Sequence, residues 1–227
     1  MTDEDAGRLG DNRLYEHLFE SILEQRLSPG ERLSEEALAT EFGVSRTIVR
    51  KVLQRLASED VLDIRPHRGA SVALTPPELA REYLAARRLI EGELAFLAGE
   101  RICARDVQVL RQLHARELAS LENGERGTGL RLSSELHFAI AGFAGNAPLA
   151  EAARRLICRN QLIVSQYERG DSDGCSCTDH AALIDAIASG NPRHAQQVMT
   201  THLDALAKRL NLGQADVTAA PFKRKQA

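Results

Sequence analysis

The sequence predicts a mainly α-helical protein of two domains, on three observations. Ala, Leu, Glu and Arg are abundant, whereas aromatic residues make up only 4% of the chain and Trp is absent, a composition that favours helices. Apolar residues recur at three- and four-residue spacing along most of the chain. Gly, Asn and Pro interrupt these stretches at intervals. At 227 residues, two small domains fit the length better than one.

The composition also limits the compartment. No run of about 18 apolar residues occurs, so we expect no membrane span. The N-terminus carries Asp3, Glu4 and Asp5 in place of the basic and then apolar pattern of a secretory signal. The four cysteines are too few and too scattered for a disulfide framework, so we interpret them as thiols. A cytoplasmic protein is expected.

Residues 1–11 are predicted to be a flexible N-terminus, and residues 12–75 the first domain. A first amphipathic helix is indicated by apolar residues at helical spacing, namely Leu14, Leu18, Ile22 and Leu23. A short second helix begins at Ser34, carries Glu35 and Glu36 where the helix dipole favours acidic groups, and ends at Gly43. Helix, Gly-containing turn and helix form the unit that presents a recognition helix to DNA.

The recognition helix is predicted over residues 45–56, with Ser45 as its N-cap. One face is apolar, through Val49, Val52, Leu53 and Leu56. Between Phe42 and Ser58 there are four basic residues and no acidic one, although the whole chain has a net charge of −3. Arg side chains at the start of a helix suit the major groove, where Arg can bond a guanine edge. The alternative is an ordinary solvated amphipathic helix.

A hairpin is predicted directly after this helix. Residues 61–65 alternate in polarity as a strand does, residues 66–69 contain the turn residues Pro66 and Gly69, and residues 70–73 return. This hairpin would form a wing whose tip residues, His67 and Arg68, could reach a minor groove or phosphates. An exposed hairpin tip without a DNA contact is the alternative.

Three segments of this domain closely resemble the winged helix-turn-helix of GntR-family transcriptional regulators: PGERLSEEALA (29–39), FGVSRTIVR (42–50) and IRPHRGA (64–70). The resemblance implies double-stranded DNA as a partner. The DNA contacts that it implies are Ser45, Arg46, Thr47, Arg50, His67 and Gly69. Some members have a basic residue where Glu36 stands, so a contact from this position is not carried over.

Residues 76–211 are predicted to form an antiparallel α-helical bundle, and residues 212–227 a disordered tail. Thr75-Pro76-Pro77 marks the domain boundary, with Pro77 in the first turn of the next helix. Gly, Asn and Pro punctuation divides the remainder into six helices, expected at about residues 78–100, 104–122, 129–144, 148–168, 178–189 and 192–212.

Three histidines lie on three of these helices, His137, His180 and His202, and each has apolar neighbours at helical spacing. Side chains that converge from facing helices are how bundles form metal sites, and imidazoles suit zinc, nickel, cobalt or iron. The alternative for each is a hydrogen-bonded core histidine.

Four segments resemble the FCD effector domain of the FadR subgroup: SELHF (134–138), GNAPL (145–149), DHAAL (179–183) and MTTHL (199–203). Many such domains hold a divalent metal through three His and one carboxylate, and bind a small carboxylate effector against it. The resemblance thus implies a divalent metal, zinc or nickel, at His137, His180 and His202. The family's carboxylate falls at Ser133, and a hydroxyl is a poorer ligand. Cys177, three residues before His180, could replace it as a thiolate or be an ordinary loop thiol.

Arg87 precedes Ile90-Glu91, where FCD proteins show an Arg followed by Leu-Glu. We hypothesise that Arg87 binds the effector carboxylate through two parallel hydrogen bonds; a surface or interhelical salt bridge is the alternative. Asn160 and Tyr167 are further candidates for effector binding, because they are polar residues of an otherwise apolar helix.

The predicted function is a metabolite-responsive DNA-binding regulator, a repressor, that reads a palindromic operator as a homodimer. A metalloenzyme is the first rival, because three histidines with an open position also hold catalytic zinc. It lacks a general base: Glu135 is two residues from His137 and points away from it. A redox sensor that uses Cys175 and Cys177 is a second rival, although cysteines one residue apart seldom reach disulfide geometry.

Overall fold

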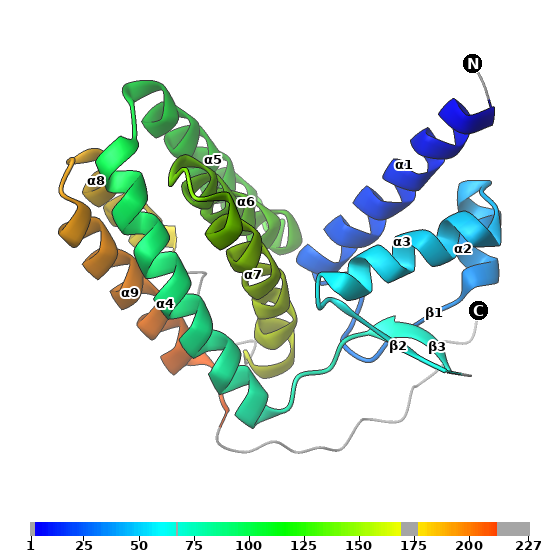
Figure 1. Ribbon diagram of the computed structural model, residues 1–227. Helices are drawn as coiled ribbons and strands as arrows, with labels where there is room; N and C mark the ends of the chain where they lie inside the picture. The colour runs from blue at the N-terminus through cyan, green and yellow to red at the C-terminus, as the bar shows by residue number, and fades with distance from the viewer. Residues whose placement is uncertain (1–2, 67, 169–176, 213–227) are drawn as a thin grey trace.

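The computed structural model describes residues 3–66, 68–168 and 177–212, and it confirms the predicted architecture (Figure 1). An N-terminal winged helix-turn-helix precedes a bundle of long helices. No helix in the described ranges combines the length and apolarity needed to cross a membrane.

The first domain contains three helices and a small sheet. The helices are α1 (Asp3–Leu23), α2 (Glu35–Phe42) and α3 (Arg46–Ser58), and the strands are β1 (Arg32–Leu33), β2 (Leu62–Arg65) and β3 (Gly69–Val72). The sheet is antiparallel in the order β1-β3-β2. The wing prediction is therefore confirmed, with β1 added to its edge. β1 has two residues and so gives no alternating pattern in the sequence.

The predicted apolar face of α3 is the centre of this domain. Val49, Val52, Leu53 and Leu56 are at most 2% exposed. They belong to one core with Leu14, Leu18 and Ile22 of α1 and with Val61 and Val72 of the wing. Each such side chain contributes about 1.5–3 kcal/mol through burial, so the orientation of the recognition helix is fixed by its own apolar face.

Within the described residues, the second domain consists of six helices: α4 (Pro77–Arg101), α5 (Ala104–Glu122), α6 (Arg126–Phe143), α7 (Ala147–Tyr167), α8 (Cys177–Ala188) and α9 (Pro192–Arg209). α4 packs along α9 and against α7, and α5 packs against α6 and α8 (Figure 1). Asn146 and Asn191 cap α7 and α9 by accepting a hydrogen bond from the backbone three residues on. The predicted helices agree with these bounds within about three residues at each end.

The structure describes the two expected terminal segments only in part. α1 begins at Asp3, within the segment 1–11 that we expected to be flexible. The expected disordered tail lies outside the described residues, apart from Leu212.

α7 joins the two domains. Its Cys158 and Leu162 are part of the apolar core of the first domain. Arg159, 6% exposed, donates to the carbonyl oxygens of Asp60 at 2.6 Å and Leu74 at 3.0 Å. At the end of the helix, Gln166 accepts a hydrogen bond from the backbone of Thr75 in the interdomain linker. The bundle and the DNA-binding domain therefore share a helix.

Candidate functional site

The start of α3 is exposed and well defined. Ser45 caps the helix and accepts a hydrogen bond from the backbone of Ile48, as predicted. Gly43 ends α2 with a φ of 64°, a left-handed conformation that glycine adopts without strain. Arg46, Thr47 and Arg50 are all exposed on the first turns of α3. These three predicted DNA contacts therefore project from one helix start into solvent.

Carboxylates of neighbouring helices contact the basic residues of α3. Arg46 pairs with Glu36 at 3.1 Å, and Arg50 pairs with Glu35 at 2.8 Å. Lys51 pairs with Asp11 of α1 at 2.6 Å. Glu36 thus pairs with a predicted base-reading arginine. Sequence reasoning missed these pairs because their partners lie far apart in the chain.

The wing carries the other two predicted DNA contacts. Gly69 is exposed and has a φ of 74°, so any residue with a side chain would be strained there even though a Cβ would meet no atom within 4 Å. His67 lies outside the described residues. The tight turn at Gly69 brings β3 back along β2, with Arg65 opposite Gly69.

The three histidines converge in the interior of the bundle. His137 comes from α6, His180 from α8 and His202 from α9, and none is more than 4% exposed. Their ring centroids are 4.8–5.4 Å apart. One nitrogen from each ring lies within 4.8 Å of one nitrogen from each of the others. The structure therefore brings together the three residues predicted as metal ligands.

Two buried carboxylates contact this cluster. Glu91 of α4, 1% exposed, accepts a hydrogen bond from Nδ1 of His137 through Oε2 and pairs with Nε of Arg87 through Oε1. Glu117 of α5, 0% exposed, lies with Oε2 2.9 Å from Nδ1 of His180 and 3.3 Å from Nδ1 of His114. Each carboxylate therefore contacts the Nδ1 nitrogen of a predicted metal ligand.

The protonation states are set by burial and by these contacts. Burial would raise the pKa of Glu91, but Arg87 and His137 outweigh it and lower this pKa to about 2. Burial likewise opposes ionisation of Glu117, yet hydrogen bonds from His180 and His114 lower its pKa below the usual value. Burial lowers the pKa of His137. Burial and the neighbouring cations together place the pKa of His202 well below its usual value. At neutral pH the carboxylates are ionised and both imidazoles are neutral.

The arrangement fits a divalent metal. Neutral imidazole nitrogens are the form that binds zinc or nickel. Nε2 of His180 and Nδ1 of His202 are buried with no hydrogen-bond partner among the described residues. The Asp179 carboxylate is 3.9 Å from Nδ1 of His202, beyond hydrogen-bonding distance. Because a buried polar atom without a partner is costly, these nitrogens are suited to an ion.

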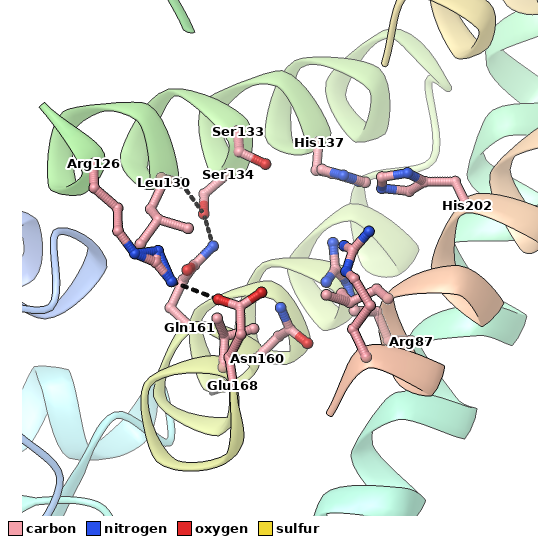
Figure 2. Close-up of a pocket in the computed structure, with 13 residues that line it drawn as sticks. Arg87, Arg126, Leu130, Ser133, Ser134, His137, Asn160, Gln161, Glu168 and His202 are labelled. Carbon is pink, nitrogen blue, oxygen red and sulfur yellow. Dashed lines mark hydrogen bonds and ion pairs between the residues drawn. The ribbon is translucent and has the colours of Figure 1, made fainter. Parts of the chain in front are cut away.

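A cavity of about 40 Å³ adjoins the histidines (Figure 2). Arg87, Ser133, His137, Asn160 and His202 are among the residues that line it. Ser133 therefore lies beside the cluster, as its spacing predicts, but it brings a hydroxyl in place of a carboxylate. The volume holds a few water molecules, so a larger ligand would require the helices to move apart.

The three predicted effector-binding residues have different positions. Arg87 is 4% exposed, lines the cavity and donates to Glu91 through Nε. Asn160 is also 4% exposed, and its Oδ1 has no partner among the described residues. Tyr167 does not line the cavity: its hydroxyl donates to the carbonyl of Thr75 at 2.6 Å. The structure therefore places Tyr167 at the linker and does not bring it together with Arg87 and Asn160.

Sequence reasoning missed several polar residues of this region. Arg126 pairs with Glu168 at 2.5 Å beside the cavity, and Arg209 lines it from α9. Glu117 carried a usable signal, because it continues the helical stripe of Leu110, Leu113 and Leu121. A carboxylate at such a position is buried and needs a partner. Cys175 and the side chain of Cys177 lie outside the described residues.

Comparison with known proteins matches both halves of the chain to family models. Residues 11–72 match the model of bacterial regulatory proteins of the gntR family, and residues 82–205 match the FCD domain. The solved structure of E. coli McbR/YncC superposes with a TM-score of 0.76 over 88% of this chain and 95% of that chain, at 19% identity. This last likeness concerns the fold alone.

The relatives in sequence are regulators. An uncharacterised HTH-type transcriptional regulator of Streptomyces ambofaciens is 30% identical over 210 residues, 88% of this chain and 84% of that protein. A Uxu operon regulator of Haemophilus influenzae is 26% identical over 216 residues, 87% of this chain and 80% of that protein. A probable D-xylose utilization operon transcriptional repressor of Paenarthrobacter nicotinovorans is 26% identical over 185 residues, 81% of each chain. The metalloenzyme alternative is therefore set aside, and the chain belongs to the GntR family of DNA-binding transcriptional regulators, with an FCD domain after its DNA-binding domain.

Proposed function

We propose that this protein is a repressor that binds a palindromic operator as a homodimer and responds to a small carboxylate. The names of its relatives, a Uxu operon regulator and a probable repressor of a D-xylose utilization operon among them, support a regulator of an operon. Two copies of α3 related by a two-fold axis would enter successive major grooves. Ser45, Arg46, Thr47 and Arg50 would contact DNA from each helix, and Gly69 from each wing.

The observation that carries the effector proposal is the convergence of three buried histidines beside a buried arginine. His137, His180 and His202 would bind a divalent metal, zinc or nickel, through one ring nitrogen each. When bound, the metal supplies a positive charge and open positions to which a carboxylate can bind. The terminal nitrogens of Arg87 would bind the same carboxylate, and Asn160 would accept a hydrogen bond from the rest of the effector.

Effector binding in the bundle would affect the DNA-binding domain through a displacement of α7. Asn160 lines the cavity, while the adjacent Arg159 bonds the backbone of the DNA-binding domain. Expansion of a cavity of only about 40 Å³ would displace this helix relative to its neighbours. The effector can shift the DNA-binding arrangement only by the difference between its affinities for the two arrangements.

Metal content is the first test. Full-length protein purified without chelator is analysed by mass spectrometry of its metals, beside His180→Ala and His194→Ala. His194 is an exposed histidine of α9 and serves as the control. About one metal per chain is expected in the wild type and in His194→Ala, with loss in His180→Ala. A wild type without metal, after dialysis against zinc and nickel, would refute the metal part of the proposal.

Arg87 is tested through the response of DNA binding. A panel of small carboxylates is screened for release of the protein from an operator selected out of a random library. Arg87→Ala should still bind this DNA but should lose the response to the active carboxylate. An unchanged response in Arg87→Ala would remove Arg87 from the effector site. Arg88→Ala is the control, because Arg88 is an exposed neighbour that pairs with Asp204.

A further inference from the structure

Two buried carboxylates, Glu91 and Glu117, contact the histidines of the cluster. Ser133 lines the cavity beside the histidines, so the cluster itself offers three imidazoles and a hydroxyl. Glu91 and Glu117 are both at most 1% exposed and come from α4 and α5, which supply none of the three histidines. Burial of an ionised carboxylate is costly, so each of the two needs a partner that offsets this cost.

Hydrogen bonding to these carboxylates fixes the form of two imidazoles. An ionised carboxylate only accepts hydrogen bonds, so the ring nitrogen that faces it must carry the proton. Glu91 faces Nδ1 of His137, and Glu117 faces Nδ1 of His180 at 2.9 Å. In a neutral ring whose Nδ1 carries the proton, the opposite nitrogen, Nε2, has a free electron pair. In His180, this Nε2 is one of the buried atoms without a partner among the described residues.

We propose that Glu91 and Glu117 are positioning residues of the metal centre: they fix the tautomer and ring orientation of His137 and His180, and they supply negative charge that Ser133 does not. The proposal rests on the proposed function in one respect, that the three histidines bind a divalent ion. Carboxylate–histidine–metal chains of this kind make the imidazole a stronger ligand, and their loss typically weakens metal binding 10- to 100-fold.

Both carboxylates are themselves fixed by a second partner. Arg87 pairs with the Oε1 oxygen of Glu91, and His114 lies 3.3 Å from the Oε2 oxygen of Glu117. Glu91 therefore contacts the proposed effector-binding arginine with one oxygen and a proposed metal ligand with the other. Glu117 links His180 to His114, whose side chain is 13% exposed. The two carboxylates thus connect the centre to two different sides of the bundle.

The experiment measures zinc affinity of the full-length protein by competition with a chromophoric chelator. Glu91→Gln and Glu117→Gln keep the side-chain shape and an acceptor oxygen but remove the charge. Each variant should bind Zn²⁺ about 10- to 100-fold more weakly than the wild type. Glu135→Gln is the matched control, because Glu135 lies two residues from His137 on α6, pairs with Arg131 and is 34% exposed. It should bind zinc as the wild type does.

Separate readouts distinguish positioning from a purely structural role. Long-range ¹⁵N–¹H spectra of the metal-free protein report which imidazole nitrogen is protonated. The wild type should show the Nδ1-protonated form of His137 and His180. In each Gln variant the amide can either accept or donate a hydrogen bond, so the facing imidazole should become a mixture of the two tautomers. The visible spectrum of the Co²⁺-loaded protein should also change in the variants but not in Glu135→Gln.

The outcomes separate this proposal from the one on which it rests. If neither the wild type nor Glu135→Gln binds zinc, the metal site itself is refuted. If the wild type binds zinc and both Gln variants bind it equally well, the positioning role alone is refuted. Should one variant fail to fold, the other decides the question, because the two carboxylates lie on different helices and contact different histidines.

Discussion

Arginine–glutamate pairs occur in both domains, but in opposite surroundings. At the recognition helix, Arg50 and Glu35 are 2.8 Å apart, and their side chains are 64% and 33% exposed. In the bundle, the side chains of Arg87 and Glu91 are 4% and 2% exposed. An exposed pair contributes about 0–1 kcal/mol, whereas loss of one partner from a buried pair costs about 3–5 kcal/mol.

The difference suits the two tasks. A DNA phosphate can replace Glu35 at Arg50 at little cost, because water already solvates both groups. The buried pair cannot be opened unless another anion reaches Arg87. We infer that exposure leaves the cations of the first domain available to DNA phosphates. Burial, in contrast, leaves Arg87 available only to an anion that enters the bundle. Four predictions test this comparison.

The largest effect is expected from Glu91→Leu. This change leaves Arg87 buried without its carboxylate, so the free energy of unfolding should fall by about 3–5 kcal/mol. Urea denaturation of the metal-free protein measures it. The double variant Arg87→Met/Glu91→Leu removes both charges and should recover most of the loss. A single variant as stable as the wild type would show that water reaches Arg87 and would contradict the comparison.

Arg159→Ala should have an intermediate effect. Arg159 is buried like Arg87, but its partners are the neutral carbonyls of Asp60 and Leu74. Loss of these bonds should lower the free energy of unfolding by about 1–3 kcal/mol. Arg155→Ala on the same helix is the control, because its pair with Glu151 is exposed, and it should change stability by less than about 1 kcal/mol. Equal effects of the two variants would mean that burial does not separate them.

The sequence predicted most of the elements and the convergence of three histidines, but not the network around the histidines. Helical spacing identifies which positions face a core, so the apolar face of α3 and the three histidines followed from it. It does not say which distant helix lies opposite. The contact of Glu91 with His137 joins residues 46 positions apart, and that of Glu117 with His180 joins residues 63 apart. Such pairings require the packing of α4 and α5 to be known.

Tyr167 illustrates the same limit of predictions from helical periodicity. As a polar residue on an apolar helix, it had the same sequence signal as Asn160. Seven positions along a helix return a side chain to nearly the same face, but about 10 Å further along the axis. Asn160 therefore reaches the cavity, whereas Tyr167 reaches Thr75 at the linker. Periodicity predicts the face of the helix on which a residue lies. It does not predict which neighbouring element lies opposite that residue along the helix axis.

Arg46→Ala should leave stability nearly unchanged and alter DNA binding. Its side chain is 59% exposed, so little packing is lost. If Arg46 reads a base, discrimination between the selected operator and random DNA should fall by about 1–3 kcal/mol. Binding titrations at a fixed salt concentration measure both affinities. Equal weakening on the two DNAs would instead identify Arg46 as a phosphate contact.

The smallest effect on stability is expected from Glu36→Gln, which removes the exposed partner of Arg46. The free energy of unfolding should change by less than about 1 kcal/mol, since both side chains are more than half exposed. Random-sequence DNA should bind more tightly, because the carboxylate no longer repels phosphate beside Arg46. Glu41→Gln, at an exposed position of the same helix without an ion pair to any described residue, controls for the change in net charge. If both variants tighten binding equally, Glu36 acts only through overall charge; a larger gain for Glu36→Gln would show that the exposed pair restrains Arg46 from non-operator DNA.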